Sequence, residues 1–69
     1  MENEILLRVE GMNGRKCEDK IVSGITRMPG VELVQVNAER GTVSVTGGDL
    51  DQLQLVDIIE SLGYTALNT

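Results

Sequence analysis

The spacing of the aliphatic residues is the feature that most constrains the fold of this chain. Apolar and polar residues alternate over residues 5–10 and 42–46, which is typical of half-buried strands. Over residues 17–28 the apolar side chains instead recur at helical spacing, with charged side chains outside that stripe. The 69 residues include no Phe or Trp, and a single cysteine cannot form an internal disulfide. Aliphatic packing must therefore hold the chain together, and we expect residues 1–69 to form one domain.

A further strand is predicted before residues 42–46. Residues 31–36 favour a strand with a bulge near Leu33, because their apolar side chains do not alternate cleanly. A polar turn separates the two segments, so they are expected to form a hairpin. We expect Gly47 and Gly48 to end the second strand of that hairpin.

A second helix is expected directly after this glycine pair. Asp49 is a suitable N-cap, and Gln52 three residues later completes a capping-box arrangement. Gly63 is the natural cap at the other end, and residues 64–67 predict a short terminal strand. The apolar face of this helix is expected to contain Leu53, Val56 and Ile59, widened by Leu55 or Leu62.

The order strand, helix, strand, strand, helix, strand defines the fold class. It predicts an α+β, two-layer, ferredoxin-like βαββαβ sandwich, in which two helices cover one face of a four-stranded antiparallel sheet. Right-handed crossovers place the first strand beside the third in the centre of the sheet. The segment that follows the first strand should then emerge at one end of the sheet.

The charge of the chain argues against one class of partner. A net charge of −5 disfavours nucleic acid, because phosphate binding requires a basic surface. An RNA-recognition module shares this order of elements, but it stacks bases on sheet aromatics and the expected central strands contain none. Basic residues do gather at Arg15, Lys16 and Lys20. That cluster has two interpretations, the steering of an acidic protein partner and a solvated helix start.

No segment is typical of a leader or a membrane span. The first four residues are polar or acidic after Met1, and no apolar run approaches membrane-spanning length. A free thiol without leader or anchor predicts a cytoplasmic location without membrane insertion. The starting methionine and the early end after the last strand favour a complete small protein.

The loop over residues 11–17 is chemically the most distinctive segment. Cys17 lies where a predicted strand gives way to a predicted helix, so free backbone N–H groups and the helix dipole favour its thiolate. We expect Cys17 to be exposed, and Arg15 and Lys16 to favour the thiolate further. Gly14 can take a positive φ, which lets the loop close without strain.

Together with other short motifs, this loop resembles a known family. The motifs are Gly11-Met12 after the first strand, Cys17 at the helix start, Pro29-Gly30-Val31 before the second strand, and Gly63-Tyr64 after the second helix. Over nearly its whole length the chain resembles the heavy-metal-associated domains of copper chaperones and metal-transporting P-type ATPases. The family's loop has the pattern Gly-Met-x-Cys-x-x-Cys. Cys17 matches its second cysteine, and Gly14 stands in place of the first.

This resemblance implies a site for a soft metal, with copper(I) as the expected ion. Copper(I) favours thiolates, and the chain has one cysteine and no histidine. The second thiolate would come from glutathione, from a partner protein such as a metal-transporting ATPase, or from Cys17 of a second copy in a homodimer. The candidate residues are Cys17 as the metal ligand and, in the loop and around it, Gly11, Met12, Asn13, Gly14, Arg15, Lys16 and Tyr64.

Two of these residues have alternative roles. Met12 is interpreted as a core anchor beneath the loop rather than as a thioether ligand. Tyr64 matches a tyrosine that lies near the metal loop in bacterial relatives, which implies packing or a hydroxyl hydrogen bond to the loop. Ordinary partial burial of Tyr64 is the other interpretation.

Two function classes compete with a metal-handling domain of weakened affinity. The first is an interaction module that keeps the fold, has lost the metal, and docks onto an acidic partner through Arg15, Lys16 and Lys20. The second is a thiol redox enzyme, which the lack of a resolving cysteine disfavours. No serine–base pair and no phosphate loop followed by lysine is present, so we predict that the chain is not an enzyme.

Overall fold

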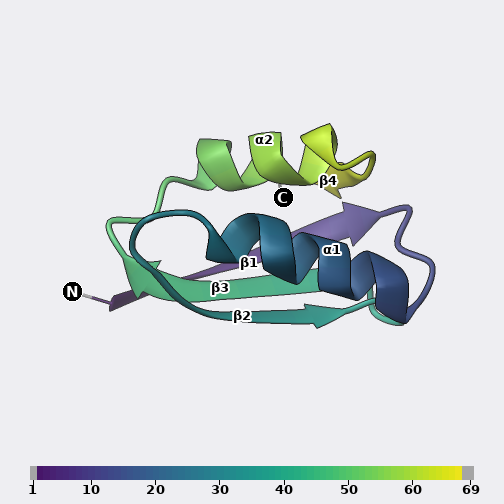
Figure 1. Ribbon diagram of the computed structural model, residues 1–69, viewed down its shortest axis with the longest axis horizontal. Helices are drawn as coiled ribbons and strands as arrows, with labels where there is room; N and C mark the ends of the chain where they lie inside the picture. Colours follow the sequence, from purple (N-terminus) through teal and green to yellow (C-terminus); the bar gives the residue numbers. More distant parts are fainter. Residues whose placement is uncertain (1, 68–69) are drawn as a thin grey trace.

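The computed structural model describes residues 2–67, with side chains from residue 3 onward. Figure 1 shows two helices lying over one sheet. The expected order of elements and the βαββαβ fold class are confirmed. The elements in chain order are β1 (Glu2–Glu10), α1 (Arg15–Thr26), β2 (Val31–Asn37), β3 (Thr42–Gly48), α2 (Gln52–Ser61) and β4 (Thr65–Leu67).

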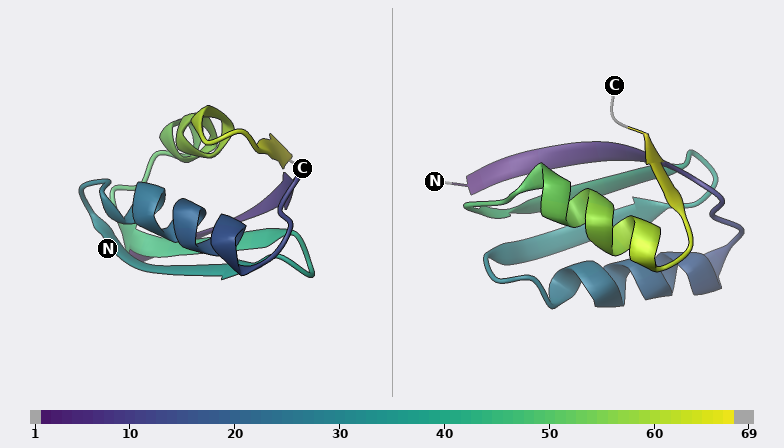
Figure 2. Two further views of the ribbon diagram at one scale, coloured as in Figure 1. Left: turned by 45° about the vertical axis from the view of Figure 1, so that its right-hand side comes forward. Right: turned by 90° about the horizontal axis from the view of Figure 1, so that it is seen from above.

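The four strands form one antiparallel sheet in the order β2-β3-β1-β4. The expected central pair of first and third strands is therefore confirmed. Both helices cover the same face of this sheet, and the other face is left open (Figure 2). The bulge expected near Leu33 is also confirmed, as a shift in register between Val31 and Leu33 where β2 pairs with β3.

The hydrophobic core lies between the helices and the sheet. The central strands β1 and β3 enter it with alternate residues, because successive side chains of a strand point to opposite faces. On β3, for example, Val43 and Val45 are fully buried while their neighbours are only half-buried. The buried core residues are Leu7, Val9, Ile21, Ile25, Val43, Val45, Leu55 and Ile59.

The expectation that the glycine pair breaks the strand after Thr46 is wrong, because β3 includes both glycines and ends at Gly48. Gly47 and Gly48 continue the strand and pair with the start of β1. A Cβ atom on Gly47 would collide with the carbonyl oxygen of Gly30, and the N–H of Gly48 donates a 2.9 Å hydrogen bond to that same oxygen. Gly47 is thus needed because two backbones approach each other closely here.

The expected N-cap of the second helix is also wrong. Asp51, not Asp49, is the N-cap of α2, and its carboxylate accepts a 3.0 Å hydrogen bond from the N–H of Leu53. Asp49 instead adopts a φ of 54° in the preceding turn. Leu53 is 72% exposed and does not belong to the apolar face, whereas Leu55 is fully buried. Ile59 is also fully buried, and Val56 and Leu62 pack against the core, so Leu53 is the one residue wrongly expected on the apolar face.

Candidate metal-binding site

The loop between β1 and α1 turns sharply at two glycines. Gly11 and Gly14 have φ values of 96° and 116°, a backbone region that other residues rarely adopt. Gly14 is also the N-cap of α1, and its carbonyl oxygen accepts a 3.2 Å hydrogen bond from the N–H of Glu18. Because Gly14 has no side chain, the cap contributes no side-chain hydrogen bond. Cys17 is therefore the third residue of α1, in the turn where the helix dipole favours an anion.

Cys17 is a free, half-buried thiol whose surroundings favour its charged form. The pKa of Cys17 is lowered first by a hydrogen bond from the Tyr64 side chain, and then by a hydrogen bond from the backbone of Asn13. Partial burial acts in the opposite direction, and the charge of Lys20 adds to the lowering. The thiol is thus less exposed than expected, and neighbouring donors rather than solvent stabilise its thiolate.

Lys20 is the cation whose charge lowers the pKa of Cys17, whereas Arg15 and Lys16 were expected to do so. Lys20 lies three residues after Cys17, so both side chains lie on one side of α1. Arg15 and Lys16 are exposed and precede Cys17 by two positions and one position, which directs them elsewhere around the helix. The spacing of Lys20 from Cys17 was the sequence signal that could have identified it.

Tyr64 reaches the loop from the far end of α2. Gly63, with a φ of 100°, follows the helix and redirects the chain, so that Tyr64 contacts the loop. A Cβ atom on Gly11 would lie 3.6 Å from the Tyr64 ring, which is ordinary van der Waals contact. The pKa of Tyr64 is raised, mainly by its hydrogen bond to Cys17. Ring and hydroxyl of Tyr64 therefore contact two ends of the loop over residues 11–17.

The other predicted loop residues differ in their surroundings. Met12 is half-buried and packs against the hydrophobic core. Asn13 and Gly14 are exposed, and no atom lies within 4 Å of where a Cβ on Gly14 would be. The geometry thus places Met12 with the core and brings Cys17, Asn13 and Tyr64 together.

Glu18 is a structural contributor that the sequence analysis missed. Its Oε2 atom accepts a 2.7 Å hydrogen bond from the N–H of Ala38, in the turn between β2 and β3. This bond spans 20 residues and ties the first turn of α1 to the hairpin. Since Glu18 directly follows Cys17, the bond also fixes the direction in which the helix presents the thiol.

The donor atoms of the described chain do not complete a metal site. Within residues 2–67 no group of three or more Cys, His, Asp or Glu side chains could hold an ion. Cys17 is one soft ligand, whereas copper(I) is well satisfied by two thiolates. The residues present therefore fit half of a two-thiolate site. In the same part of the chain no helix is long and apolar enough to cross a membrane.

The fold and the loop define a class, a small βαββαβ domain that presents a thiolate at the start of its first helix. The model of the "Heavy-metal-associated domain" family matches residues 6–65. The chain therefore belongs to the heavy-metal-associated domain family.

Individual relatives within the family are of two kinds. The chain is 39% identical over 66 residues to "Copper chaperone CopZ" of Staphylococcus aureus, covering 93% of this chain and 96% of that protein. It is 38% identical over 68 residues to "Probable copper-transporting ATPase PacS" of Synechocystis. That match covers 96% of this chain but only 9% of the ATPase. The match thus spans nearly the whole chaperone but only a small part of the transporter.

Solved structures of both kinds share the fold. The structure of a "CopZ metallochaperone" has a TM-score of 0.91 and 34% identity, and the match covers 94% of this chain and all of that one. The N-terminal domain of PacS from Synechocystis has a TM-score of 0.82 and 34% identity, with 94% of each chain covered.

Proposed function

We propose that this chain is a soft-metal-binding, chaperone-like domain whose cargo is copper(I), bound through Cys17. The observation that carries the proposal is the placement of Cys17 in the first turn of α1, where Tyr64 and Asn13 donate hydrogen bonds to its sulfur. Family membership supports the same function, since relatives at 38–39% identity are described as a copper chaperone and a copper-transporting ATPase. In this proposal residues 1–69 act as one domain and carry out no catalysis.

The site is weakened because Gly14 stands where the family's loop has its first cysteine. Cys17 alone supplies one thiolate, and linear copper(I) needs a second. That second thiolate comes from outside the chain, either from a thiol such as glutathione, from a partner protein, or from Cys17 of a second copy. Met12 anchors the loop to the core and does not bind the ion.

The proposed partner is a metal-transporting ATPase, and the proposed location is the cytoplasm. A metal carrier must release its cargo, and a site with a single protein thiolate can pass copper(I) to a protein that offers two. The similarity to PacS, described as a probable copper-transporting ATPase, supports a partner of that type.

The test is an anaerobic titration with copper(I) against a competing chelator, with and without glutathione. The parent protein should bind copper(I) more tightly when glutathione is present, and Cys17→Ala should lose that binding. Asp57→Ala serves as a control, because Asp57 is exposed and lies on α2, outside the loop. Equal binding by Cys17→Ala and the parent would refute the proposal.

The incomplete donor set also favours a second candidate function. A domain with one thiolate and no metal cluster within residues 2–67 could act as an interaction module that binds no metal. Its docking surface would be the basic start of α1, formed by Arg15, Lys16 and Lys20. Charge reversal at these three residues should then abolish capture of an acidic partner, and unchanged capture would eliminate this alternative.

A further inference from the structure

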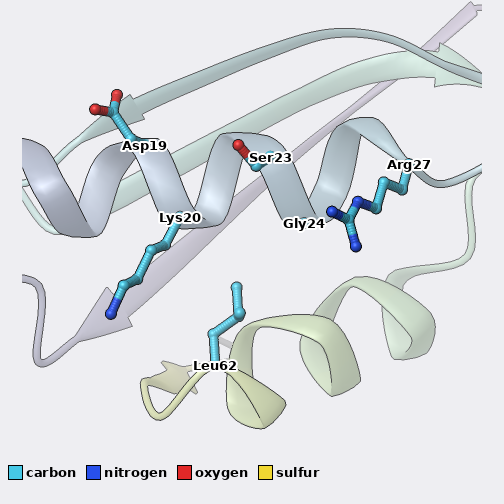
Figure 3. A pocket seen from close by; sticks show the side chains of 6 residues that line it. All are labelled: Asp19, Lys20, Ser23, Gly24, Arg27 and Leu62. Carbon is cyan, nitrogen blue, oxygen red and sulfur yellow. The ribbon is translucent and has the colours of Figure 1, made fainter.

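A groove of about 310 Å³ lies between α1 and α2 (Figure 3). The two helices approach each other closely beside the groove. A Cβ atom on Gly24 would lie 3.2 Å from Leu62 Cδ1 and 3.3 Å from Ile58 Cγ2, which is tighter than ordinary contact. The residues that line the groove are Asp19, Lys20, Ser23, Gly24, Arg27 and Leu62.

The groove is basic although the chain as a whole is acidic. Figure 3 shows Lys20 and Arg27 extending toward α2 on either side of Leu62, while Asp19 points away from that helix. The two cations are seven residues apart on α1, which corresponds to about 10 Å along the helix axis. An occupant of this groove is therefore expected to carry negative charge near both ends.

Cys17 lies three residues before Lys20 on α1, just beyond the residues that line the groove. Cys17, Lys20, Gly24 and Arg27 follow one another at intervals of three and four residues, so they share one side of α1. Lys20 is near enough to act on the charge of Cys17. On the opposite wall, Leu62 is two residues from Tyr64, which bonds to the same sulfur. A ligand that extends beyond Lys20 along this side of α1 would therefore reach Cys17.

We infer that this groove binds the carboxylates of a low-molecular-weight acidic thiol, which supplies the second thiolate for copper(I) at Cys17. The inference rests on the proposed function and names the source of the missing ligand. Glutathione is the representative, with one thiol and two carboxylates. Each of the two thiols releases one proton when its sulfur binds the metal, and copper keeps its oxidation state.

Two observations favour a small thiol over the other sources. The groove volume lies at the low end of the range of small-molecule sites, about 300–1,000 Å³. Pairing of two copies through Cys17 about a two-fold axis would bring Lys20 of one copy toward Lys20 of the other. Such like-charge contact opposes a homodimer, whereas the same lysine attracts a carboxylate.

The groove can be tested without metal and without the thiol reaction. S-methylglutathione keeps both carboxylates but cannot bind through sulfur. Titrated into the metal-free protein, it should shift the backbone amide NMR signals of residues 20–27 and of Leu62. The double variant Lys20→Ala, Arg27→Ala should weaken this binding by about tenfold. Arg8→Ala with Arg40→Ala removes the same charge away from the groove and should bind like the parent.

Equal weakening in both double variants would overturn the inference, because net charge rather than the groove would then govern binding. Shifts spread over the sheet, with none at residues 20–27, would overturn it as well. Circular dichroism confirms that each variant is folded before titration.

Retention of copper(I) in the presence of two different thiols tests the groove separately from the proposed function. The parent should retain copper(I) better with glutathione than with the uncharged thiol 2-mercaptoethanol. The Lys20→Ala, Arg27→Ala variant should lose that preference. If the preference persists, the groove assignment fails while copper binding through Cys17 stands. If Cys17→Ala takes up copper(I) like the parent under either thiol, the proposed function itself fails.

Discussion

The Tyr64 side chain donates a hydrogen bond to the sulfur of Cys17, and this bond joins two residues that are 47 positions apart in the sequence. Cys17 comes from the first turn of α1, while Tyr64 follows α2. Each of the two residues changes the pKa of the other. The helix start favours the thiolate, and the hydrogen bond from the Tyr64 hydroxyl stabilises it further.

Replacing Tyr64 with Phe should raise the pKa of Cys17 toward its ordinary value, because the largest cause of its lowering is removed. The ring and its contact with Gly11 are retained, so the fold should be unchanged. The rate of Cys17 alkylation by iodoacetamide, measured against pH, reports the pKa. The profile should move to higher pH in Tyr64→Phe, and an unmoved profile would show that the hydroxyl does not act on the thiol.

The stability of the domain should depend on pH through the same two residues. Folding lowers the pKa of Cys17, so the folded state binds fewer protons, and stability rises with pH toward the unfolded-state value of about 8.5. Folding raises the pKa of Tyr64, so its contribution is complete below about pH 10 and is lost above that. Urea unfolding followed by circular dichroism should show this rise and fall in the parent.

Cys17→Ser is the control for that experiment. It keeps the size of the side chain but does not ionise in this range. Its free energy of unfolding should lack the rise between neutral pH and pH 9. A rise equal to that of the parent would assign the effect to other groups.

Replacing Gly14 with Cys should strengthen copper(I) binding and remove the need for an added thiol. No atom lies within 4 Å of the new Cβ, so the side chain has space. The φ of 116° at this position is unfavourable for any residue but glycine, so the metal-free variant should lose about 1–3 kcal/mol of stability. Gly14→Ala measures the backbone cost alone. Binding that still requires glutathione in Gly14→Cys would place this residue outside the metal site.

Replacing Glu18 with Ala should destabilise the domain by about 1–3 kcal/mol, because the N–H of Ala38 loses its charged acceptor. Asp19→Ala removes the same charge from an exposed neighbour and should have little effect. Urea unfolding compares the two variants. Similar losses in both would mean that the 2.7 Å bond to Ala38 contributes little.

Periodicity predicted the order of the elements, because strand alternation and helical spacing are local properties. It failed where a distant segment decides the outcome. Gly47 looked like a strand end, yet it remains in β3 because the backbone of Gly30 passes against it. Asp49 and Asp51 are both suitable N-caps, and the choice between them depends on how far β3 extends.

The candidate site was predictable to a similar degree. The position of Cys17 at a helix start followed from the chain order alone. Its contact with Tyr64 could be named only through the family resemblance, since it depends on how α2 packs beside α1. The helical spacing of Cys17 and Lys20 predicts that they lie on one side of α1, whereas Arg15 and Lys16 are close to Cys17 only in sequence. The groove between the helices depends on Gly24 and Leu62, 38 residues apart, and has no local signal.

The central claim is that this chain binds copper(I) through Cys17 with a thiol from outside. Native mass spectrometry under anaerobic conditions, with copper(I) and glutathione present, tests it most directly. The parent should carry one copper and one glutathione per chain, and Cys17→Ala should carry neither. Copper retained by Cys17→Ala in the same amount as by the parent would contradict it.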